Sequence, residues 1–184
     1  SGDAARELWK VGTTQSITWS AAQVTTVRSY VSLDGGTNWT LLGEALGSTS
    51  AYSWAIPDSQ QVSNNAKIKI VDKDDTDVYS ISPKAFDIIA VFTLAHPQSG
   101  DILIAQESYQ VEWTKYGTGV PNVVLDMKTS ASGEWATIGT VTNSGSYIWP
   151  EVTGTVLSDD CWFRVKDPSN AAAYDESNAA FRIR

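Results

Sequence analysis

Four aspartates within six residues form the group of side chains best suited to bind a metal ion. They are Asp72, Asp74, Asp75 and Asp77. Carboxylate oxygens are the ligands that Ca²⁺ prefers, and loops with closely spaced acidic residues are a common way to supply them. This loop lacks the glycine at the sixth position and the distal glutamate of an EF-hand. We therefore interpret it as a solvated acidic loop between two strands, with calcium binding at these four residues as the alternative.

Residue types that support catalysis are scarce. The chain contains one histidine, His96, and one cysteine, Cys161. A single histidine leaves no zinc-binding set, and no serine or cysteine nucleophile motif accompanies it. Cys161 alternates with Phe163 and Val165, which predicts a small buried hydrophobic side chain rather than a reactive thiol. The sequence predicts a protein that is not an enzyme and needs no cofactor, apart from the calcium considered above.

The eight tryptophans are the other residues that could bind a ligand, because an exposed indole ring can stack on a sugar. Four of them lie in alternating strand patterns that suit core positions, namely Trp19, Trp54, Trp113 and Trp149. Trp9, Trp135 and Trp162 are expected at the surface, and nothing indicates that they gather on one face. Trp135 and Trp162 are the candidates for sugar stacking.

A tight hairpin turn is predicted at Asp34-Gly35-Gly36-Thr37-Asn38, because glycine supplies the positive φ that short hairpins need. Asn38-Trp39-Thr40 follows in the same exposed turn and matches the pattern for N-glycosylation. Asn38 is therefore a candidate glycosylation site.

The charge balance limits the classes of partner. A net charge of −8 argues against nucleic acid and against an anionic membrane surface, because both require clustered Lys and Arg. No apolar run approaches the length of a membrane span, so membrane insertion is not expected. Ser1 does not begin a signal peptide and indicates a processed or trimmed end, as exported proteins commonly have.

The chain repeats its landmarks at a spacing of 94 or 95 residues. The matching pairs are Trp19/Trp113, Tyr52/Tyr147, Trp54/Trp149, Phe86/Phe181 and Ser82/Ser177. This period is too long for a solenoid unit and fits one small domain. We expect two copies of one domain, at residues 1–89 and 90–184.

Alternation of apolar and polar residues dominates both copies, and no segment has a helical period over three turns. Gln15–Trp19 and Tyr109–Trp113 are examples of half-buried strands. About seven short strands per ~95 residues, separated by turn signals, predict two tandem immunoglobulin-like antiparallel β-sandwich domains in an all-β protein. The paired cysteines of antibody domains are absent from the sequence.

The two copies differ at their start. The second opens with Val91-Phe92-Thr93-Leu94-Ala95, whereas the first opens directly at Ser1-Gly2-Asp3. The first domain is therefore expected to lack the strand that residues 91–95 give the second. We expect an open sheet edge there, of the kind that recruits strands from other chains.

The order of landmarks resembles the immunoglobulin-like repeat of large prokaryotic surface and secreted proteins, a repeat related to the domain of Ser/Thr-rich, GPI-anchored cell-wall proteins. The segments that carry the resemblance are Trp9–Gly12, Ile17–Trp19, Ser32–Trp39, Tyr52–Pro57 and Ser82–Ile88, with Val111–Trp113, Tyr147–Pro150 and Ser177–Ile183 in the second copy. The second copy lacks counterparts of Trp9-Lys10-Val11-Gly12 and of the Asp34-Gly35-Gly36 turn. The resemblance implies extracellular stalks, adhesins and cell-envelope layers, and it brings no catalytic residues.

These observations together predict an extracellular or cell-surface structural subunit of a layer, stalk or filament. Its partners would be other copies, joined head to tail, or other surface proteins. A carbohydrate-binding or adhesive module that recognises glycans is the alternative.

Overall fold

The computed structural model describes residues 6–152 and 157–184 of the chain. It divides into two compact units, Ser1–Ile89 and Ala90–Arg184, here called unit 1 and unit 2. Both are built from strands, and the one described helical element is a single 3₁₀ turn at Gly47–Thr49. The expected processed end at Ser1 lies outside the described residues.

Unit 1 contains a large and a small sheet. The large sheet has the order β1 (Leu8–Lys10), β8 (Phe86–Ile89), β6 (Ser63–Asp72), β3 (Thr26–Ser32) and β4 (Thr40–Leu46), with β7 (Tyr79–Ile81) also paired to β6. The small sheet consists of β2 (Thr14–Thr18) and β5 (Ala51–Ala55) alone.

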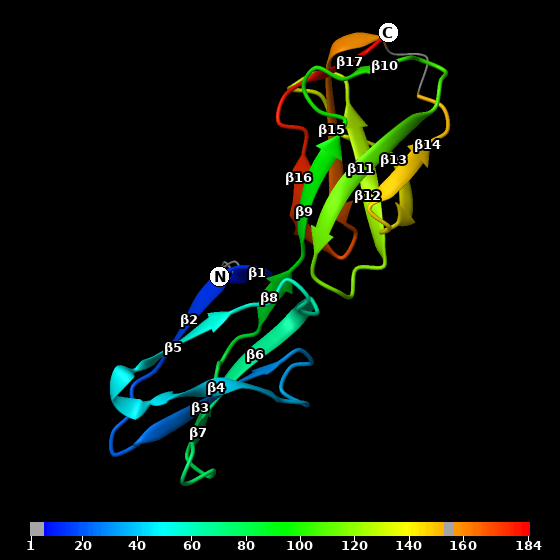
Figure 1. Cartoon of the computed structure of the whole chain (residues 1–184). Coiled ribbons are helices and arrows are strands. Elements are labelled where there is room, and N and C mark those ends of the chain that lie inside the picture. The colour runs from blue at the N-terminus through cyan, green and yellow to red at the C-terminus, as the bar shows by residue number, and fades with distance from the viewer. Residues whose placement is uncertain (1–5, 153–156) are drawn as a thin grey trace, which may run out of the picture. The chain divides into compact units, whose positions relative to one another are not determined.

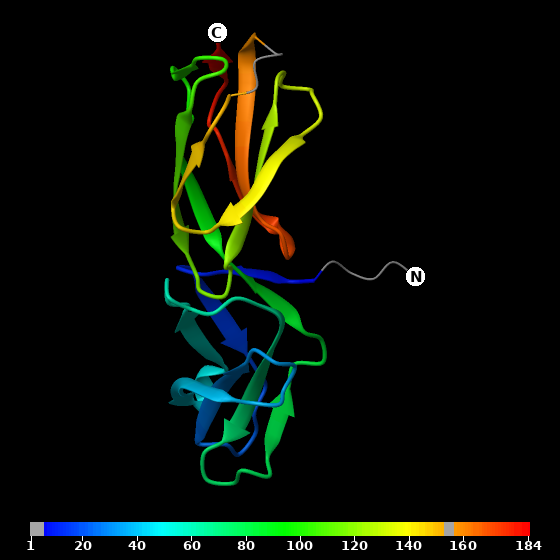
Figure 2. The ribbon, with the colours of Figure 1, turned by 90° about the vertical axis from the view of Figure 1, so that its right-hand side faces the viewer.

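Unit 2 repeats this plan with one additional strand. Its large sheet has the order β10 (Ile102–Leu103), β17 (Phe181–Ile183), β15 (Ser158–Asp167), β12 (Asn122–Lys128) and β13 (Ala136–Thr142), with β16 (Asn170–Glu176) paired to β15. Its second sheet has the order β14 (Ser146–Trp149), β11 (Tyr109–Tyr116) and β9 (Val91–His96). In Figure 2 the strands β11 and β14, in green and gold, lie on one side of this unit, and the orange strand β15 and yellow-green β12 lie on the other.

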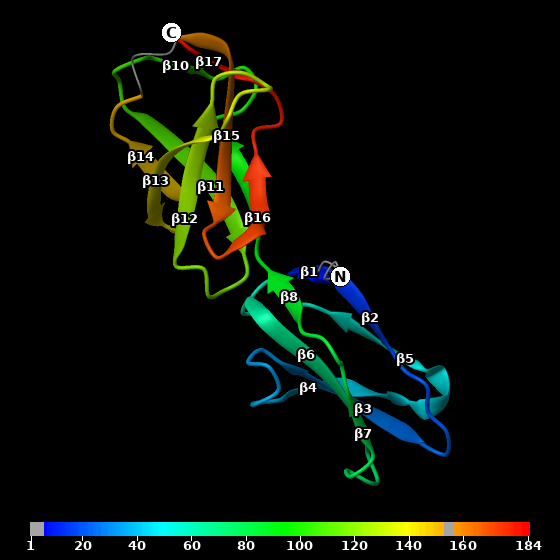
Figure 3. The same ribbon diagram turned by 180° about the vertical axis from the view of Figure 1, so that it is seen from behind.

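The prediction of an all-β protein with two immunoglobulin-like sandwiches is confirmed. Neighbouring strands pair antiparallel, with one short parallel pair in each unit. Trp9 pairs with Ile88 in unit 1, and Leu103 pairs with Ile183 in unit 2. Figure 3 shows β12, β15 and β16 side by side in unit 2.

The core lies between the two sheets of each unit and follows from the alternation along the strands. On β15, Cys161, Phe163 and Val165 are fully buried, while the residues between them face outward. The expected buried role of Cys161 is confirmed. Burial raises the pKa of its thiol, which keeps it in the neutral form that suits a core.

Trp9 corrects one expectation, because its side chain is buried and not at the surface. Only 6% of it is exposed, and its ring lies 4.1 Å from that of Phe86 and 6.0 Å from that of Trp54. Pairing of β1 with β8 turns Trp9 inward, while Leu8 and Lys10 on either side of it remain exposed.

The predicted turn after β3 is held by the side chains of Ser32 and Asp34. Asp34 Oδ1 accepts hydrogen bonds from the backbone N–H groups of Thr37 (3.0 Å) and Asn38 (2.8 Å). Hydrogen bonds from Asn38 and Ser32 lower the pKa of Asp34 to about 2. Gly35 and Gly36 have φ values of +77° and +106°, which explains why glycine occupies both positions.

Trp19 and Trp113 occupy equivalent core positions but differ in one hydrogen bond. This difference predicts that substituting them will destabilise the two units unequally. Trp113 donates its indole N–H to Asn143 Oδ1 at 2.9 Å, whereas the buried indole N–H of Trp19 has no partner among the described residues. Trp113→Phe leaves the buried amide of Asn143 short of a partner, which costs about 1–3 kcal/mol beyond the lost packing. Trp19→Phe loses packing alone. Trp113→Phe should therefore destabilise unit 2 more than Trp19→Phe destabilises unit 1.

Urea unfolding of both variants, followed by amide signals assigned to each unit, measures this difference. Equal losses of unfolding free energy in the two units would contradict it.

Candidate functional site

A cluster of cations and aromatic rings covers the outer face of the large sheet in unit 2. We call it the cation–aromatic face, and its members are Lys128, Trp135, Trp162, Arg164 and Tyr174. Lys128 Nζ lies 4.8 Å from the ring centre of Trp135 and 5.5 Å from that of Trp162. The Arg164 guanidinium lies 4.3 Å from the Trp135 ring and 5.7 Å from the Tyr174 ring. These distances are within the range of cation–π attraction.

The two tryptophans predicted to stack on sugars therefore lie together. Nothing in the sequence indicated that they gather on one face, but Lys128 on β12 lies against the rings of both of them. The Trp162 indole N–H also donates to Asp160 Oδ1 at 2.9 Å, which fixes that ring further. Both rings are half-buried, and the cations occupy the positions above their π faces that a sugar would need.

Asp126 anchors this face from within the sheet. Its side chain is 1% exposed, yet its carboxylate is 2.7 Å from Arg164 Nη2 and 2.7 Å from Lys166 Nζ. Thr137 Oγ1 donates a further hydrogen bond at 2.8 Å. Burial by itself raises the pKa of Asp126, but the hydrogen bonds from Lys166, Arg164 and Thr137 outweigh it and lower the pKa overall. The carboxylate is thus a charged, fully partnered buried group.

The sequence interpretation missed Asp126, Lys128 and Arg164 as parts of a common surface. They come from β12 and β15, and only the pairing of these two strands brings them together. The outward alternation of Trp162 and Arg164 along β15 was the available signal.

Unit 1 carries a smaller version of the same face. Lys69 Nζ lies 4.9 Å from the Trp39 ring and 5.2 Å from the Tyr30 ring. Tyr30 stands where unit 2 has Asp126, so no buried carboxylate holds this lysine from below. A hollow of about 410 Å³ lies beside these side chains and next to Tyr79.

The acidic loop does not bring its carboxylates to one point. Asp72 Oδ1 accepts the backbone N–H of Asp74 (3.0 Å), and Asp75 Oδ1 accepts that of Asp77 (3.1 Å). Within residues 6–152 and 157–184, no group of three or more His, Cys, Asp or Glu side chains is placed to hold a metal ion. Calcium binding at these aspartates stays a prediction, which calorimetry can test.

Asn38 is exposed in the turn after β3, as the glycosylation hypothesis requires. Its amide donates a hydrogen bond to Asp34 Oδ2 at 2.6 Å, so a glycan on this nitrogen would compete with the turn contact. Glycosylation at Asn38 also stays a prediction.

The second candidate site is an open sheet edge in unit 1. In unit 2, β11 pairs with β14 on one side and with β9 on the other. Figure 1 shows β9 between β11 and β16. In unit 1, β2 pairs with β5 alone, and no described strand takes the place of β9. Two hollows lie along this edge, lined by residues of β2, the segment after it, β6 and β7.

Comparison with known proteins gives similarity to solved structures alone. No known family model and no curated protein matches the chain. Fibronectin(III)-like modules of Clostridium thermocellum CbhA are 16% identical, with 97% of this chain and 90% of that chain covered and a TM-score of 0.36. The four N-terminal Ig domains of Dscam1 isoform 1.9 are 11% identical (TM-score 0.42), covering 96% of this chain and 43% of that one.

A tetra-tandem repeat from the extending region of a large adhesion protein is 16% identical, with a TM-score of 0.34. It covers 95% of this chain, which spans 48% of that structure. At these levels of similarity the fold assignment rests on the strands themselves. In the part of the chain that the structure describes, no helix is long and apolar enough to span a membrane.

Removal of the buried charge beneath the cation–aromatic face is expected to destabilise unit 2. Asp126→Asn weakens charged hydrogen bonds to Arg164 and Lys166 and should cost about 1.5–3 kcal/mol at neutral pH. The folded-state pKa of Asp126 is lowered, so its stabilisation is present above the unfolded pKa of about 3.9 and is lost as pH falls through the folded value. The difference in unfolding free energy between wild type and Asp126→Asn should therefore shrink only below about pH 4.

Urea unfolding of unit 2 between neutral and acid pH measures both effects. Asp159→Asn is the matched control, because Asp159 pairs with Arg184 on the surface and should change stability by less than about 1 kcal/mol. A difference in unfolding free energy that stays constant across the acid range would contradict the assigned role of Asp126.

Proposed function

We propose that this chain is a non-catalytic structural module that assembles, with other copies or other surface proteins, into an extracellular layer, stalk or filament. The observation that carries the proposal is the open edge of unit 1 at residues 18–22, where β2 ends. An exposed strand edge presents unpaired N–H and C=O groups and favours pairing with another chain. In unit 2, β9 covers residues 112–116, and the repeat spacing places residues 18–22 at that position in unit 1, so the two copies differ in the feature that assembly requires.

The chemistry of the reactive side chains supports a non-catalytic role. The Cys161 thiol is buried, and burial raises its pKa, which disfavours the nucleophilic thiolate. His96 Nδ1 lies 2.9 Å from Asp101 Oδ2, and this hydrogen bond raises the pKa of His96. A raised pKa increases the protonated fraction of the imidazole, and the protonated ring cannot act as a general base.

The resemblance of the sequence to repeats of prokaryotic surface proteins supports an extracellular location. A net charge of −8 agrees with a soluble surface module that avoids nucleic acid. Assembly through sheet edges also makes direct use of duplication, because two sandwiches in one chain can present one closed and one open edge.

Self-association of the purified chain tests the proposal. Sedimentation velocity and negative-stain images over a range of concentrations should show ordered oligomers that grow with concentration. Val78→Lys places a charge on the open edge and should reduce association. Leu41→Lys changes a side chain of the same 50% exposure on β4 and is the matched control. A chain that stays monomeric at all concentrations, alone and with other surface proteins of its source, would overturn the proposal.

The second candidate is a carbohydrate-binding or adhesive module, and the observation that favours it is the pair Trp135 and Trp162. A sugar would have to displace Lys128 or Arg164 to reach a ring face. Binding to a glycan array that is lost in both Trp135→Ala and Trp162→Ala would support this function. Ordered assembly without sugar, unchanged in these two variants, would count against it.

A further inference from the structure

We propose that the outer face of the large sheet in unit 1 binds a sugar that carries a carboxylate group. Lys69 pairs with the carboxylate, and the ring of Tyr79 packs against the face of the sugar. The site is separate from Trp135 and Trp162 in unit 2, and it needs neither a second copy of the chain nor the open sheet edge. The inference is therefore independent of the proposed assembly.

In unit 2 the central cation of the outer face is neutralised by carboxylates of the protein itself. Arg164 pairs with Asp126 on β12 and with Glu176 on β16. Its Nη2 lies 2.7 Å from Asp126 Oδ2, and its Nη1 lies 3.8 Å from Glu176 Oε1. The guanidinium thus has acidic partners on both neighbouring strands, and this face has no need of a carboxylate from a ligand.

In unit 1 the corresponding cation has no such partners on its neighbouring strands. Lys69 corresponds to Arg164 at the repeat spacing, but it pairs with Tyr30 on β3 and with Ile81 on β7. Neither of these side chains supplies a carboxylate. The ammonium lies 5.2 Å from the Tyr30 ring and 4.9 Å from the Trp39 ring. An ammonium has three N–H donors, and contact with two π faces leaves it able to donate to an anionic oxygen.

A second lysine adds to the positive charge of this face. Lys67 lies two residues before Lys69 on β6, so both side chains leave the strand on the same side. A Cβ on Gly36 would lie 3.3 Å from Trp39 Cζ2 and 4.0 Å from Lys67 Cδ, so these two side chains flank the same turn. In the described part of the chain, neither lysine has a carboxylate within ion-pair distance. Two neighbouring cations without counter-charges favour an anionic ligand.

The hollow of about 410 Å³ beside Lys69 has mainly aromatic and apolar walls. Lys69 is the one charged residue among those that line it, and Thr76 is the one lining residue from the acidic loop. Tyr30, Tyr79 and Thr76 bring hydroxyl groups to the walls, and hydroxyl groups both donate and accept hydrogen bonds. Pockets for small ligands have this size and this combination of rings with a few polar groups.

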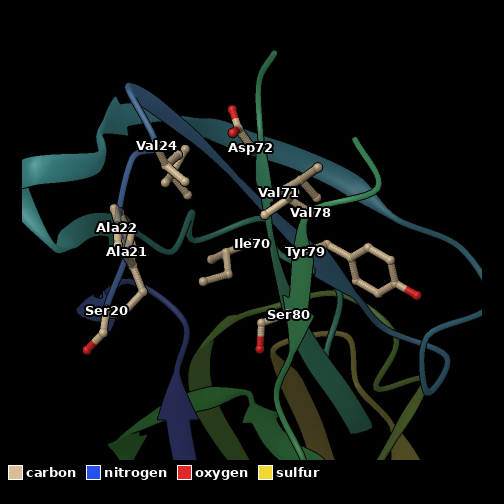
Figure 4. Close-up of a pocket in the computed structure, with 12 residues that line it drawn as sticks. Ser20, Ala21, Ala22, Val24, Ile70, Val71, Asp72, Val78, Tyr79 and Ser80 are labelled. Atoms are coloured by element: carbon tan, nitrogen blue, oxygen red, sulfur yellow. The ribbon is translucent and has the colours of Figure 1, made fainter. Parts of the chain in front are cut away.

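The Tyr79 ring is the aromatic surface that a sugar can reach in this hollow, because it is 60% exposed. Figure 4 shows this ring pointing away from Ile70 and Ala22, which line the separate hollow at the sheet edge. In unit 2 the equivalent ring of Tyr174 lies 5.7 Å from the Arg164 guanidinium, whereas no cation of the described residues lies over the Tyr79 ring. A sugar can therefore pack its C–H face against Tyr79 without displacing a cation.

The aromatic wall favours a sugar over an acidic peptide as the source of the carboxylate. A sugar ring has C–H groups on its face and hydroxyl groups at its rim. It can contact the ring of Tyr79 and the hydroxyl of Thr76 while its carboxylate pairs with Lys69. A flexible aspartate or glutamate side chain would satisfy the lysine alone.

Titration with matched acidic and neutral sugars tests the site. Trigalacturonic acid and its methyl ester have the same rings, as do sialyllactose and the lactose within it, and only the first of each pair is charged. Calorimetry should show saturable binding of at least one acid, and binding of its neutral partner at least about tenfold more weakly. Amide signals of Lys69 and Tyr79 should shift during the titration, while those of Trp135 and Trp162 should not. Added salt should weaken binding, because the charge pair is close to solvent.

Substitutions in unit 1 give the second test. Lys69→Gln should weaken binding of the acid at least about tenfold. Lys73→Gln is the matched control, because it removes the same charge from a 41% exposed lysine that pairs with Glu44, and it should leave the affinity unchanged. Tyr79→Ala removes an exposed ring and should also weaken binding about tenfold. Tyr174→Ala, at the equivalent position of unit 2, should have no effect.

Three results would overturn the inference. They are no saturable binding of either acid up to about 1 mM, equal affinity for an acid and its neutral partner, and signal shifts confined to unit 2. A tetraglutamate peptide that binds as tightly as the acidic sugars would show recognition of charge alone, which would also overturn it.

Sedimentation of the same samples separates this inference from the proposed function. Sugar binding at Lys69 and Tyr79 by a chain that never assembles supports the sugar site and removes the assembly role. A chain that assembles but binds neither acid loses the sugar site and keeps the assembly role.

Discussion

Every backbone N–H and C=O of a strand needs a partner, and this requirement explains the main differences between the two units. In unit 2, β9 provides that partner for β11 and also covers part of β16. In unit 1 the described residues provide none, and the effects reach three elements. β2 stops at Thr18, β7 is reduced to three residues, and Val78 is left half in solvent. The presence or absence of this one strand ladder thus sets strand length, local burial and whether the sheet has an open edge there.

The inner faces of the two large sheets have the same burial pattern, whereas their outer faces are built from different residues. The inner faces of β6 and β15 repeat the same pattern, because Ala66 and Ile68 match Cys161 and Phe163 in burial. The outer faces keep a cation between aromatic rings but build it from different residues. Lys69 lies between Tyr30 and Trp39 in unit 1, whereas unit 2 adds a buried aspartate beneath its cations. Core packing restricts the size and shape of the inner side chains, whereas an outer cluster needs only a cation in contact with aromatic rings.

Much of the fold could be predicted from the sequence, because alternation and a 95-residue spacing are local and repeated signals. Burial of Trp113 and Cys161 and the turn at Asp34 follow from them. Trp9 is the exception, because the three alternating residues Leu8–Lys10 form too short a pattern to indicate which face is buried. Its burial depends on a parallel pairing with β8 that lies almost 80 residues away.

The candidate surfaces were less predictable, since they depend on sheet order. Lys128 lies against both Trp135 and Trp162 because β12 lies between β13 and β15, and nothing local in the sequence indicates that order.

The proposed assembly role would depend on many weak contacts acting together. A contact formed at a short sheet edge is weak in isolation, because much of its binding energy offsets the cost of ordering the groups that meet there. Once several subunits are linked, each further contact forms at a high effective concentration, so an array of such contacts is stable as a whole. The short open edge beside residues 18–22 of unit 1 would therefore be sufficient for the proposed role in an array of many copies.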